Sequence, residues 1–157
     1  MISHQLKLTA SILLCLGAGF LGSVFSAPVI GTWYAQLNKP FFNPPGWIFG
    51  PVWTLLYVLM GISLYLVWTK PGARKKHPYA VKFFFTQLGL NVLWSVIFFG
   101  LQNPLAALLE ILLLQVAILI TARSFQSISH RASLLLYPYI AWVFFAALLN
   151  LSIVILN

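Results

Sequence analysis

The stretch WIFGPVWTLLYVLMGISLYLVW, residues 47–68, decides the fold, because it runs for 22 residues without a charged side chain. A helix that crosses the hydrocarbon core of a bilayer needs about 20 mainly apolar residues. The whole chain agrees, since 61% of its 157 residues are hydrophobic and only 6% are charged, whereas a soluble domain carries about 25% charged residues. The sequence therefore predicts a single transmembrane domain over residues 1–157.

Four further apolar runs of similar length accompany this stretch, and clusters of turn-forming residues separate all five. The expected spans are residues 6–25, 47–68, 79–99, 105–122 and 134–156. The predicted fold class is all-α integral membrane, a five-transmembrane-helix bundle. No internal repeat is visible, so nothing indicates an inverted-repeat transporter.

Basic residues are concentrated on one side of this topology. Eight of the nine Lys and Arg residues fall at the N-terminus or in loops 2–3 and 4–5, and only Lys39 falls on the other side. Cytoplasmic loops carry an excess of Lys and Arg, so we expect the N-terminus inside and the C-terminus outside. The charges are too few and too scattered for a nucleic-acid surface, and contacts with membrane lipid explain them better. We expect a multi-pass protein of a bacterial inner membrane, or of an organelle membrane such as the mitochondrial outer membrane if the source is eukaryotic.

The first apolar run has an alternative interpretation as a signal peptide, because Lys7 gives it a basic start. The cleavage site would be poor, with Phe25 three residues before the cut at Ala27 and Pro28 directly after it. The run is also long for the apolar region of a signal peptide. A membrane-spanning helix is therefore the preferred interpretation.

Metal ligands are sparse. The single cysteine, Cys15, lies inside an apolar run, and His4, His77 and His130 are scattered. None of them shares a motif with another ligand, so we expect no metal site and no obligate cofactor. Hydrolytic triads and phosphate-binding loops are likewise missing from the sequence, so no conventional enzyme is indicated.

The segment between the first two spans, residues 28–46, is rich in proline and aromatic residues. Its prolines fix φ and remove backbone donors, and they push the preceding residues toward extended conformations. We therefore expect an ordered, non-helical lid whose rings lie at interface depth or over the mouth of the bundle. An aromatic belt anchor would explain Trp33 and Trp47 but not the density of prolines.

Helical spacing places polar and aromatic residues on shared faces. The three faces are Trp53 and Tyr57; Gln87, Asn91, Trp94 and Phe98; and Tyr139, Trp142, Ala146 and Asn150. Polar side chains at membrane depth face the protein interior. The faces therefore predict either bonds between packed helices or an aromatic pocket for a flat macrocycle. Spacing alone favours packing.

Three motifs resemble the TspO/MBR family, also called the translocator protein, tryptophan-rich sensory protein or peripheral benzodiazepine receptor family. The first is WYAQLNKPFFNPP (33–45) followed by GPVWTLLY (50–57), and the others are QLGLNVLWSVIFFG (87–100) and YPYIAWVFFAALLN (137–150). The resemblance covers most of the chain. It implies a five-helix bundle, commonly a homodimer, in which the lid folds over a pocket that opens toward the lid side.

The resemblance implies that the ligand is a porphyrin, such as protoporphyrin IX or heme, or another apolar small molecule. The implied function is porphyrin sequestration, sensing or stress regulation. Porphyrin or sterol transport is one alternative, although the end NLSIVILN lacks the Tyr and basic residue of the weak cholesterol motif found in animal members. Light-dependent porphyrin degradation is another, in which Trp53 and Trp142 would act as catalytic redox partners of the excited porphyrin.

The faces and the resemblance together give a set of expected ligand-binding residues. They are Trp33, Tyr34, Lys39, Phe42, Pro44, Trp53, Tyr57, Gln87, Asn91, Trp94, Phe98, Tyr139, Trp142, Ala146 and Asn150. For Lys39 two roles remain open, pairing with a porphyrin carboxylate and reaching toward lipid headgroups.

Two other features of the spans stand out. Glu110 is an acid inside the fourth span, and such residues are functional candidates by default; we expect it to be protonated or bonded to a neighbouring helix. The first span carries a stripe of small residues that allows close helix approach, within the bundle or in a dimer. The stripe consists of Ser11, Cys15, Ala18, Gly19 and Gly22.

Overall fold

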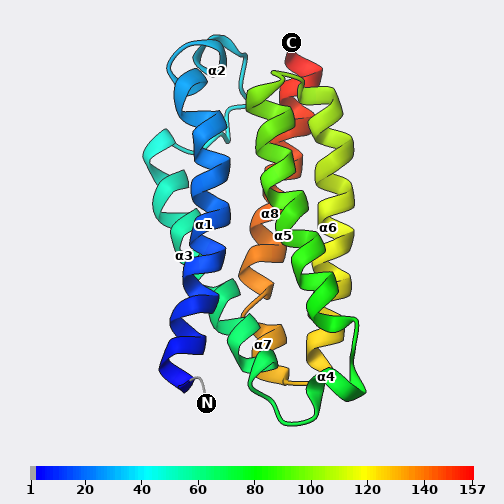
Figure 1. Ribbon diagram of the computed structural model, residues 1–157. Coiled ribbons are helices and arrows are strands. Elements are labelled where there is room, and N and C mark those ends of the chain that lie inside the picture. Colours follow the sequence, from blue (N-terminus) through cyan, green and yellow to red (C-terminus); the bar gives the residue numbers. More distant parts are fainter. Residues whose placement is uncertain (1–2) are drawn as a thin grey trace.

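The computed structural model of the protein describes residues 3–157, and for Arg74 and Lys76 it describes the backbone alone. Five long apolar segments run side by side as a bundle, with the chain ends at opposite ends of it (Figure 1). The long helices are α1 (His4–Ile30), α3 (Gly46–Trp68), α5 (Ala80–Ser95) continuing into the π-helical turn η1 (Val96–Gly100), α6 (Pro104–Gln126) and α8 (Tyr137–Leu156). The short helices are α2 (Trp33–Gln36), α4 (Ala73–Lys76) and α7 (His130–Leu134).

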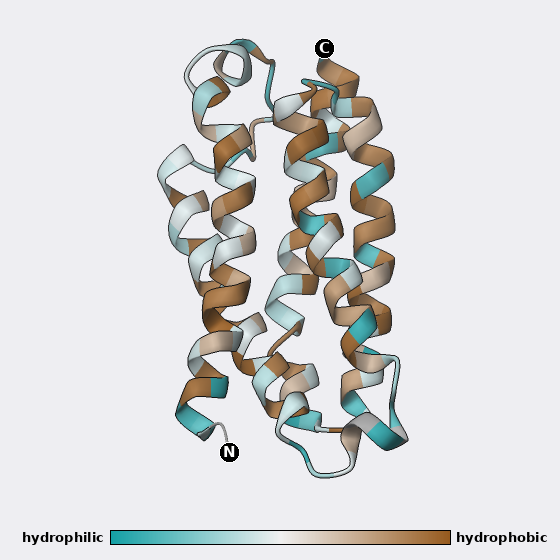
Figure 2. Ribbon diagram, in the orientation of Figure 1, coloured by the Kyte–Doolittle hydropathy of each residue, from teal (hydrophilic) through white to brown (hydrophobic). Residues whose placement is uncertain are grey.

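The prediction of an all-α protein with five helices able to cross a membrane is confirmed. Most of the ribbon along the bundle is apolar, and polar residues occur at the two ends and at a few positions along the helices (Figure 2). Large apolar side chains such as Leu13, Leu109 and Leu113 are exposed on the outside, as expected of surface that faces lipid tails. The protein is therefore an integral multi-pass membrane protein.

The core lies where the helices meet, and small residues set the closest approaches. Phe84 of α5 stacks on Phe125 of α6, with ring centroids 5.7 Å apart. Helix α3 passes so close to α1 that a Cβ atom built on Gly61 would lie 2.5 Å from the Cα of Ile12. Glycine at this position therefore permits the contact between α1 and α3, as small residues do in membrane helix pairs.

The helix α1 is longer than expected and contains Pro28, which the sequence had suggested as a break. Proline removes one backbone donor, and here that loss falls in the last turn, so the helix continues to Ile30. The lid is also not wholly non-helical, because residues 33–36 form the helical turn α2. These residues include no proline, so their backbone donors are intact. Residues 37–45 are non-helical, as predicted.

Two irregularities in the long helices were not anticipated. The expected third span ends in a π-turn, in which Leu101 N donates to Val96 O over 2.8 Å. The fifth span divides into α7 and α8, since Pro138 near the start of α8 has no N–H to continue α7. Helix α6 extends to Gln126, whereas the expected fourth span ended at residue 122. The hydropathy pattern indicates only the residues that lie in the hydrocarbon core, and the last turn of α6 is polar.

Candidate functional site: a lidded aromatic cavity

A cavity of about 700 Å³ lies in the half of the bundle nearest the lid. Its walls come from α1, α3, α5 with η1, and α8, and the lid contributes Tyr34, Ala35, Lys39 and Asn43. The elements at opposite sides of the cavity are distant in sequence, so the site exists only when the whole bundle is assembled.

Aromatic rings form most of the wall on α3, α5 and α8. Trp53 stacks on Tyr57, with centroids 5.6 Å apart and planes 27° from parallel. Trp94 stacks on Phe98 at 4.9 Å and 23°. On α8, Trp142 meets Phe49 of α3 edge to face at 5.8 Å. Rings in such pairs hold one another in place. The cavity is therefore lined by aromatic rings whose orientations are fixed by packing on neighbouring rings.

The opposite wall, on α1, is made largely of small residues. Its lining comprises Leu16, Gly19, Phe20, Gly22, Ser23, Ser26 and Ile30. A Cβ atom on Gly19 would overlap the Tyr57 ring, and one on Gly22 would lie 3.0 Å from Ser95 Oγ. The small-residue stripe therefore packs α1 against α3 and α5 and at the same time widens the cavity.

Hydrogen bonds fix the polar groups at the bottom of the cavity. Asn91 Oδ1 accepts a short hydrogen bond from the Tyr57 hydroxyl, and Asn91 Nδ2 donates to the Tyr139 hydroxyl over 3.0 Å. Tyr57 and Asn91 line the cavity, while Tyr139 is completely buried beneath them. Tyr57 and Asn91 form the cavity floor, and Tyr139 supports the floor from below.

Asn150 makes a second cross-helix link. Its Oδ1 accepts from Trp94 Nε1 over 3.2 Å, and its Nδ2 donates to Pro104 O over 2.8 Å. Asn150 therefore ties α8 to both α5 and the start of α6. The packing role expected of Asn91 and Asn150 is observed, and both also line the cavity.

Two buried polar atoms of the lining have no hydrogen-bond partner among residues 3–157: Trp142 Nε1 and Asn43 Oδ1. Lys39 Nζ donates to the carbonyls of Ala35 and Leu37, which leaves one of its three protons uncommitted. These two atoms are covered by the protein, so Lys39 is the lining residue that offers an uncommitted donor and a positive charge to the edge of a ligand.

Several contacts hold the lid in place. Trp33 meets Phe98 at 5.7 Å, and Phe42 meets Phe145 of α8 at 6.3 Å. Asn38 N donates to Asn157 Oδ1 over 2.9 Å, and Asn157 Nδ2 donates to Asn38 O over 3.0 Å. This reciprocal pair, called here the Asn38–Asn157 latch, joins the lid to the end of α8.

Tyr34 sits at the inner side of the lid, where it contacts Phe98 and Phe99. Burial there raises the pKa of its phenol above the usual value, because the charged form loses hydration. The Lys39 ammonium lies 4.7 Å from the centroid of the same ring. The lid thus presents a neutral phenol and a cation side by side.

Ten of the fifteen expected ligand-binding residues line the cavity: Tyr34, Lys39, Trp53, Tyr57, Asn91, Trp94, Phe98, Trp142, Ala146 and Asn150. The other five lie outside its lining. Trp33, Phe42 and Pro44 belong to the lid, where Trp33 packs on Phe98 and Phe42 on Phe145. Gln87 and Tyr139 lie deeper than the floor, and neither amide atom of buried Gln87 has a hydrogen-bond partner among the described residues.

The sequence interpretation missed the part of the lining on α1 and missed Phe49 and Asn43. Two of the α1 residues, Gly19 and Gly22, belong to the small-residue stripe that the sequence predicts to be a helix contact. Ser23 and Ser26 lie on the same helical face and extend that stripe, which is the signal that could have revealed this wall. Small residues serve helix packing in most membrane helices, so residue type alone does not distinguish the two roles.

Glu110 is buried with 5% exposure on α6. Neither of its carboxyl oxygens has a hydrogen-bond partner in the part of the chain that the structure describes. A bond to a neighbouring helix, one of the two states expected for it, is therefore not observed. Glu110 does not line the cavity.

The comparisons with known proteins agree with the motifs. The sequence model of the TspO/MBR family matches residues 11–156. The chain is 53% identical to the tryptophan-rich protein TspO of Archaeoglobus fulgidus over 97% of both chains. It is 41% identical to the human translocator protein, over 83% of this chain and 78% of that one. It is 34% identical to the tryptophan-rich sensory protein of Cereibacter sphaeroides, over 80% and 77%. This chain therefore belongs to the TspO/MBR family.

Proposed function

We propose that this protein binds a tetrapyrrole, such as protoporphyrin IX or heme, in the lidded cavity and acts in porphyrin sequestration, sensing or stress regulation. The observation that carries the proposal is the shape and lining of the cavity. Its volume of about 700 Å³ falls within the range of about 300–1,000 Å³ that is usual for small-molecule sites. A flat macrocycle would bury one face against the aromatic wall and the other against the small residues of α1.

One charged residue of the lining fits the edge of such a ligand. Porphyrin carboxylates are hydrogen-bond acceptors and anions. Lys39 lines the cavity and retains a free proton and a positive charge. A charge-assisted hydrogen bond is stronger than a neutral one, so Lys39 would favour a dicarboxylate over its uncharged diester.

The names of relatives support two versions of this function. The name of the Cereibacter sphaeroides protein refers to a sensory role, and that of the human protein refers to translocation. Binding with occupancy-dependent signalling needs only the cavity and the lid. Transport also needs a route through the membrane, and the one acid in the chain, Glu110, offers no chain of intramembrane charges for ion coupling.

The test is a titration of protoporphyrin IX into the detergent-purified protein in the dark, followed by tryptophan fluorescence. We expect saturable quenching with a 1:1 endpoint. Trp142→Phe should weaken binding, whereas Trp47→Phe should not, because Trp47 is 75% exposed and outside the cavity lining. Lys39→Gln should weaken the dicarboxylate more than the dimethyl ester. Linear, unsaturable quenching that is the same in all variants would refute a specific site.

A second candidate function is light-driven porphyrin degradation, because Trp53 and Trp142 both line the cavity. In that reaction an excited porphyrin takes one electron from an indole, which leaves a porphyrin radical anion and an indole radical cation. The radical anion then adds dioxygen, which is the oxidant that opens the macrocycle, and the adduct returns one electron to the indole radical cation, so that porphyrin and dioxygen are consumed and the indole is regenerated. Illumination in air should bleach the porphyrin bands with a new product, and Trp53→Phe or Trp142→Phe should abolish this. An unchanged spectrum after illumination would leave binding as the function.

A further inference from the structure

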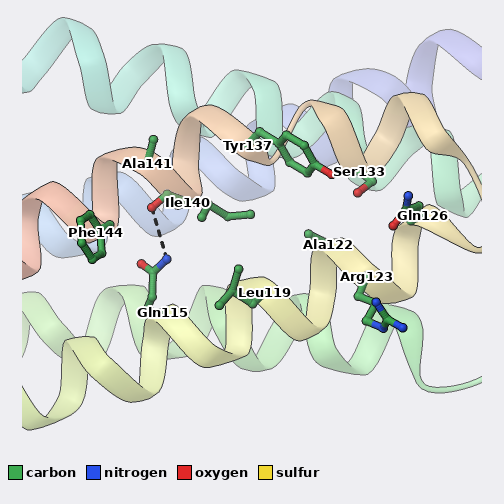
Figure 3. Close-up of a pocket in the computed structure, with 10 residues that line it drawn as sticks. All are labelled: Gln115, Leu119, Ala122, Arg123, Gln126, Ser133, Tyr137, Ile140, Ala141 and Phe144. Carbon is green, nitrogen blue, oxygen red and sulfur yellow. Dashed lines mark hydrogen bonds between the residues drawn. The ribbon is translucent and has the colours of Figure 1, made fainter.

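A second hollow lies on the outer face of the bundle, between α6 and the first half of α8 (Figure 3). We call it the α6–α8 groove. Its volume is about 650 Å³, and it shares no lining residue with the lidded cavity. Its lining comprises Gln115, Leu119, Ala122, Arg123, Gln126, Ser133, Tyr137, Ile140, Ala141 and Phe144.

Polar and apolar residues are separated along the α6–α8 groove. Arg123, Gln126 and Tyr137 are exposed at the end of the groove nearest the N-terminal end of the bundle. Leu119, Ala141 and Phe144 are exposed farther toward the middle of the helices. A ligand that fits must therefore be amphiphilic, with its polar part at Arg123.

The length of the groove matches one leaflet of a bilayer. Eight residues separate Gln115 from Arg123 on α6, which is about 12 Å at a rise of about 1.5 Å per residue. Half of a hydrocarbon core about 30 Å thick is about 15 Å. Near the deep end, Gln115 Nε2 donates to Ile140 O across the two helices over 3.3 Å, and Phe144 lies beyond this link (Figure 3). An acyl chain that starts at Arg123 would thus run to the middle of the membrane.

Arg123 has no acid within the chain to pair with. The chain contains one acidic side chain, Glu110, which lies 13 residues away on the same helix, or about 20 Å along its axis. Arg123 is exposed, so its guanidinium is free to bind an anion from outside the chain, and its planar fork matches the oxygens of a phosphate. The charge at the mouth of the groove therefore selects an anionic headgroup.

We propose that the α6–α8 groove is a binding site for one anionic phospholipid, with its phosphate on Arg123 and an acyl chain along Leu119, Ala141 and Phe144. The occupant is a lipid of the leaflet at the N-terminal end of the bundle. This lipid site is separate from the lidded cavity, because the two sites share no lining residue.

The test is native mass spectrometry of the delipidated full-length protein, titrated with phosphatidylglycerol and, separately, phosphatidylcholine. We expect one phosphatidylglycerol molecule to remain bound at collision energies that remove phosphatidylcholine. Arg123→Gln should weaken the phosphatidylglycerol adduct about tenfold or more, since hydrogen bonds to charged groups are among the strong ones. Ala141→Trp, at an exposed position that narrows the groove, should reduce binding of both lipids.

Lys82→Gln is the matched control. Lys82 lies exposed near the start of α5, at the same end of the bundle but outside the α6–α8 groove. Its loss removes the same charge and should leave the single tight adduct intact. Equal losses in Arg123→Gln and Lys82→Gln, or equal retention of the two lipids by the unmodified protein, would overturn the proposal in favour of general surface attraction.

Discussion

The contact between α1 and α3 gives the sharpest test of the packing. Replacing Gly61 by alanine would place a Cβ atom 2.5 Å from Ile12 Cα and 2.9 Å from Ile12 N. Non-bonded carbon atoms prefer about 3.5–4.0 Å, so about 1 Å of separation is missing. Because the obstacle is backbone, a side-chain rotation cannot relieve it, and α1 as a whole must shift away from α3.

The magnitude follows from two opposing terms. Overpacking of this kind costs about 1–3 kcal/mol, and contact with backbone places Gly61→Ala near the upper end. Alanine is favoured over glycine in a helix by about 1 kcal/mol, which leaves a net loss of about 2 kcal/mol. Gly17→Ala on α1 is the matched control, since nothing lies within 4 Å of its added Cβ. That variant should be neutral or stabilised by up to about 1 kcal/mol.

The assay is reversible unfolding from mixed micelles by added SDS, followed by tryptophan fluorescence. The two variants should differ by about 3 kcal/mol in the free energy of unfolding, with Gly61→Ala the less stable. If they agree within about 0.5 kcal/mol, which is the usual effect of a substitution away from such features, the close approach of α1 and α3 is refuted.

Three more outcomes are expected. Asn91→Leu should lower the free energy of unfolding by about 2–4 kcal/mol, because it leaves the buried hydroxyls of Tyr57 and Tyr139 without Asn91; an effect below about 1 kcal/mol would contradict the floor network. Asn157→Ala should break the Asn38–Asn157 latch, so that backbone amides of residues 37–39 exchange with deuterium faster while those of α6 do not; unchanged lid exchange would show that the latch does not hold the lid. Burial raises the pKa of Tyr34, so the folded state holds its proton longer than the unfolded chain, and stability should fall as the pH rises above about 10. This loss should be smaller in Tyr34→Phe, and identical pH profiles would exclude the burial of that phenol.

Much of the fold could be predicted from the sequence because the hydrocarbon core imposes length and composition on each span. The helix ends could not, since Pro28 is tolerated in the last turn of α1 and the polar turn around Arg123 continues α6. The π-turn at Val96–Gly100 depends on tertiary packing, and no residue type there signals it.

For the site, helical spacing reveals the face of a residue but not its depth. Asn91 and Gln87 share a face of α5, yet Asn91 lines the cavity and Gln87 does not, because it lies one turn, about 6 Å, below the floor. The same holds for Trp142 and Tyr139 on α8. The contribution of α1 was hidden for a different reason, since small residues give the same signal whether they face a helix or an empty space.

The wall on α1 has a consequence for how binding preference can diverge among related chains. An aromatic wall can adapt to a new ligand by turning a ring, but Gly19 and Gly22 present backbone, which cannot yield. The clearance between the two walls is therefore determined by the residue types at positions 19, 22, 23 and 26. A methyl group added at position 19 or 22 would press on Tyr57 or Ser95, which line the same cavity, and would therefore change its shape. The size of the residues at these four positions therefore limits the thickness of the ligand. Comparing these positions among relatives should separate proteins that accept a planar ligand from proteins that accept a bulkier one.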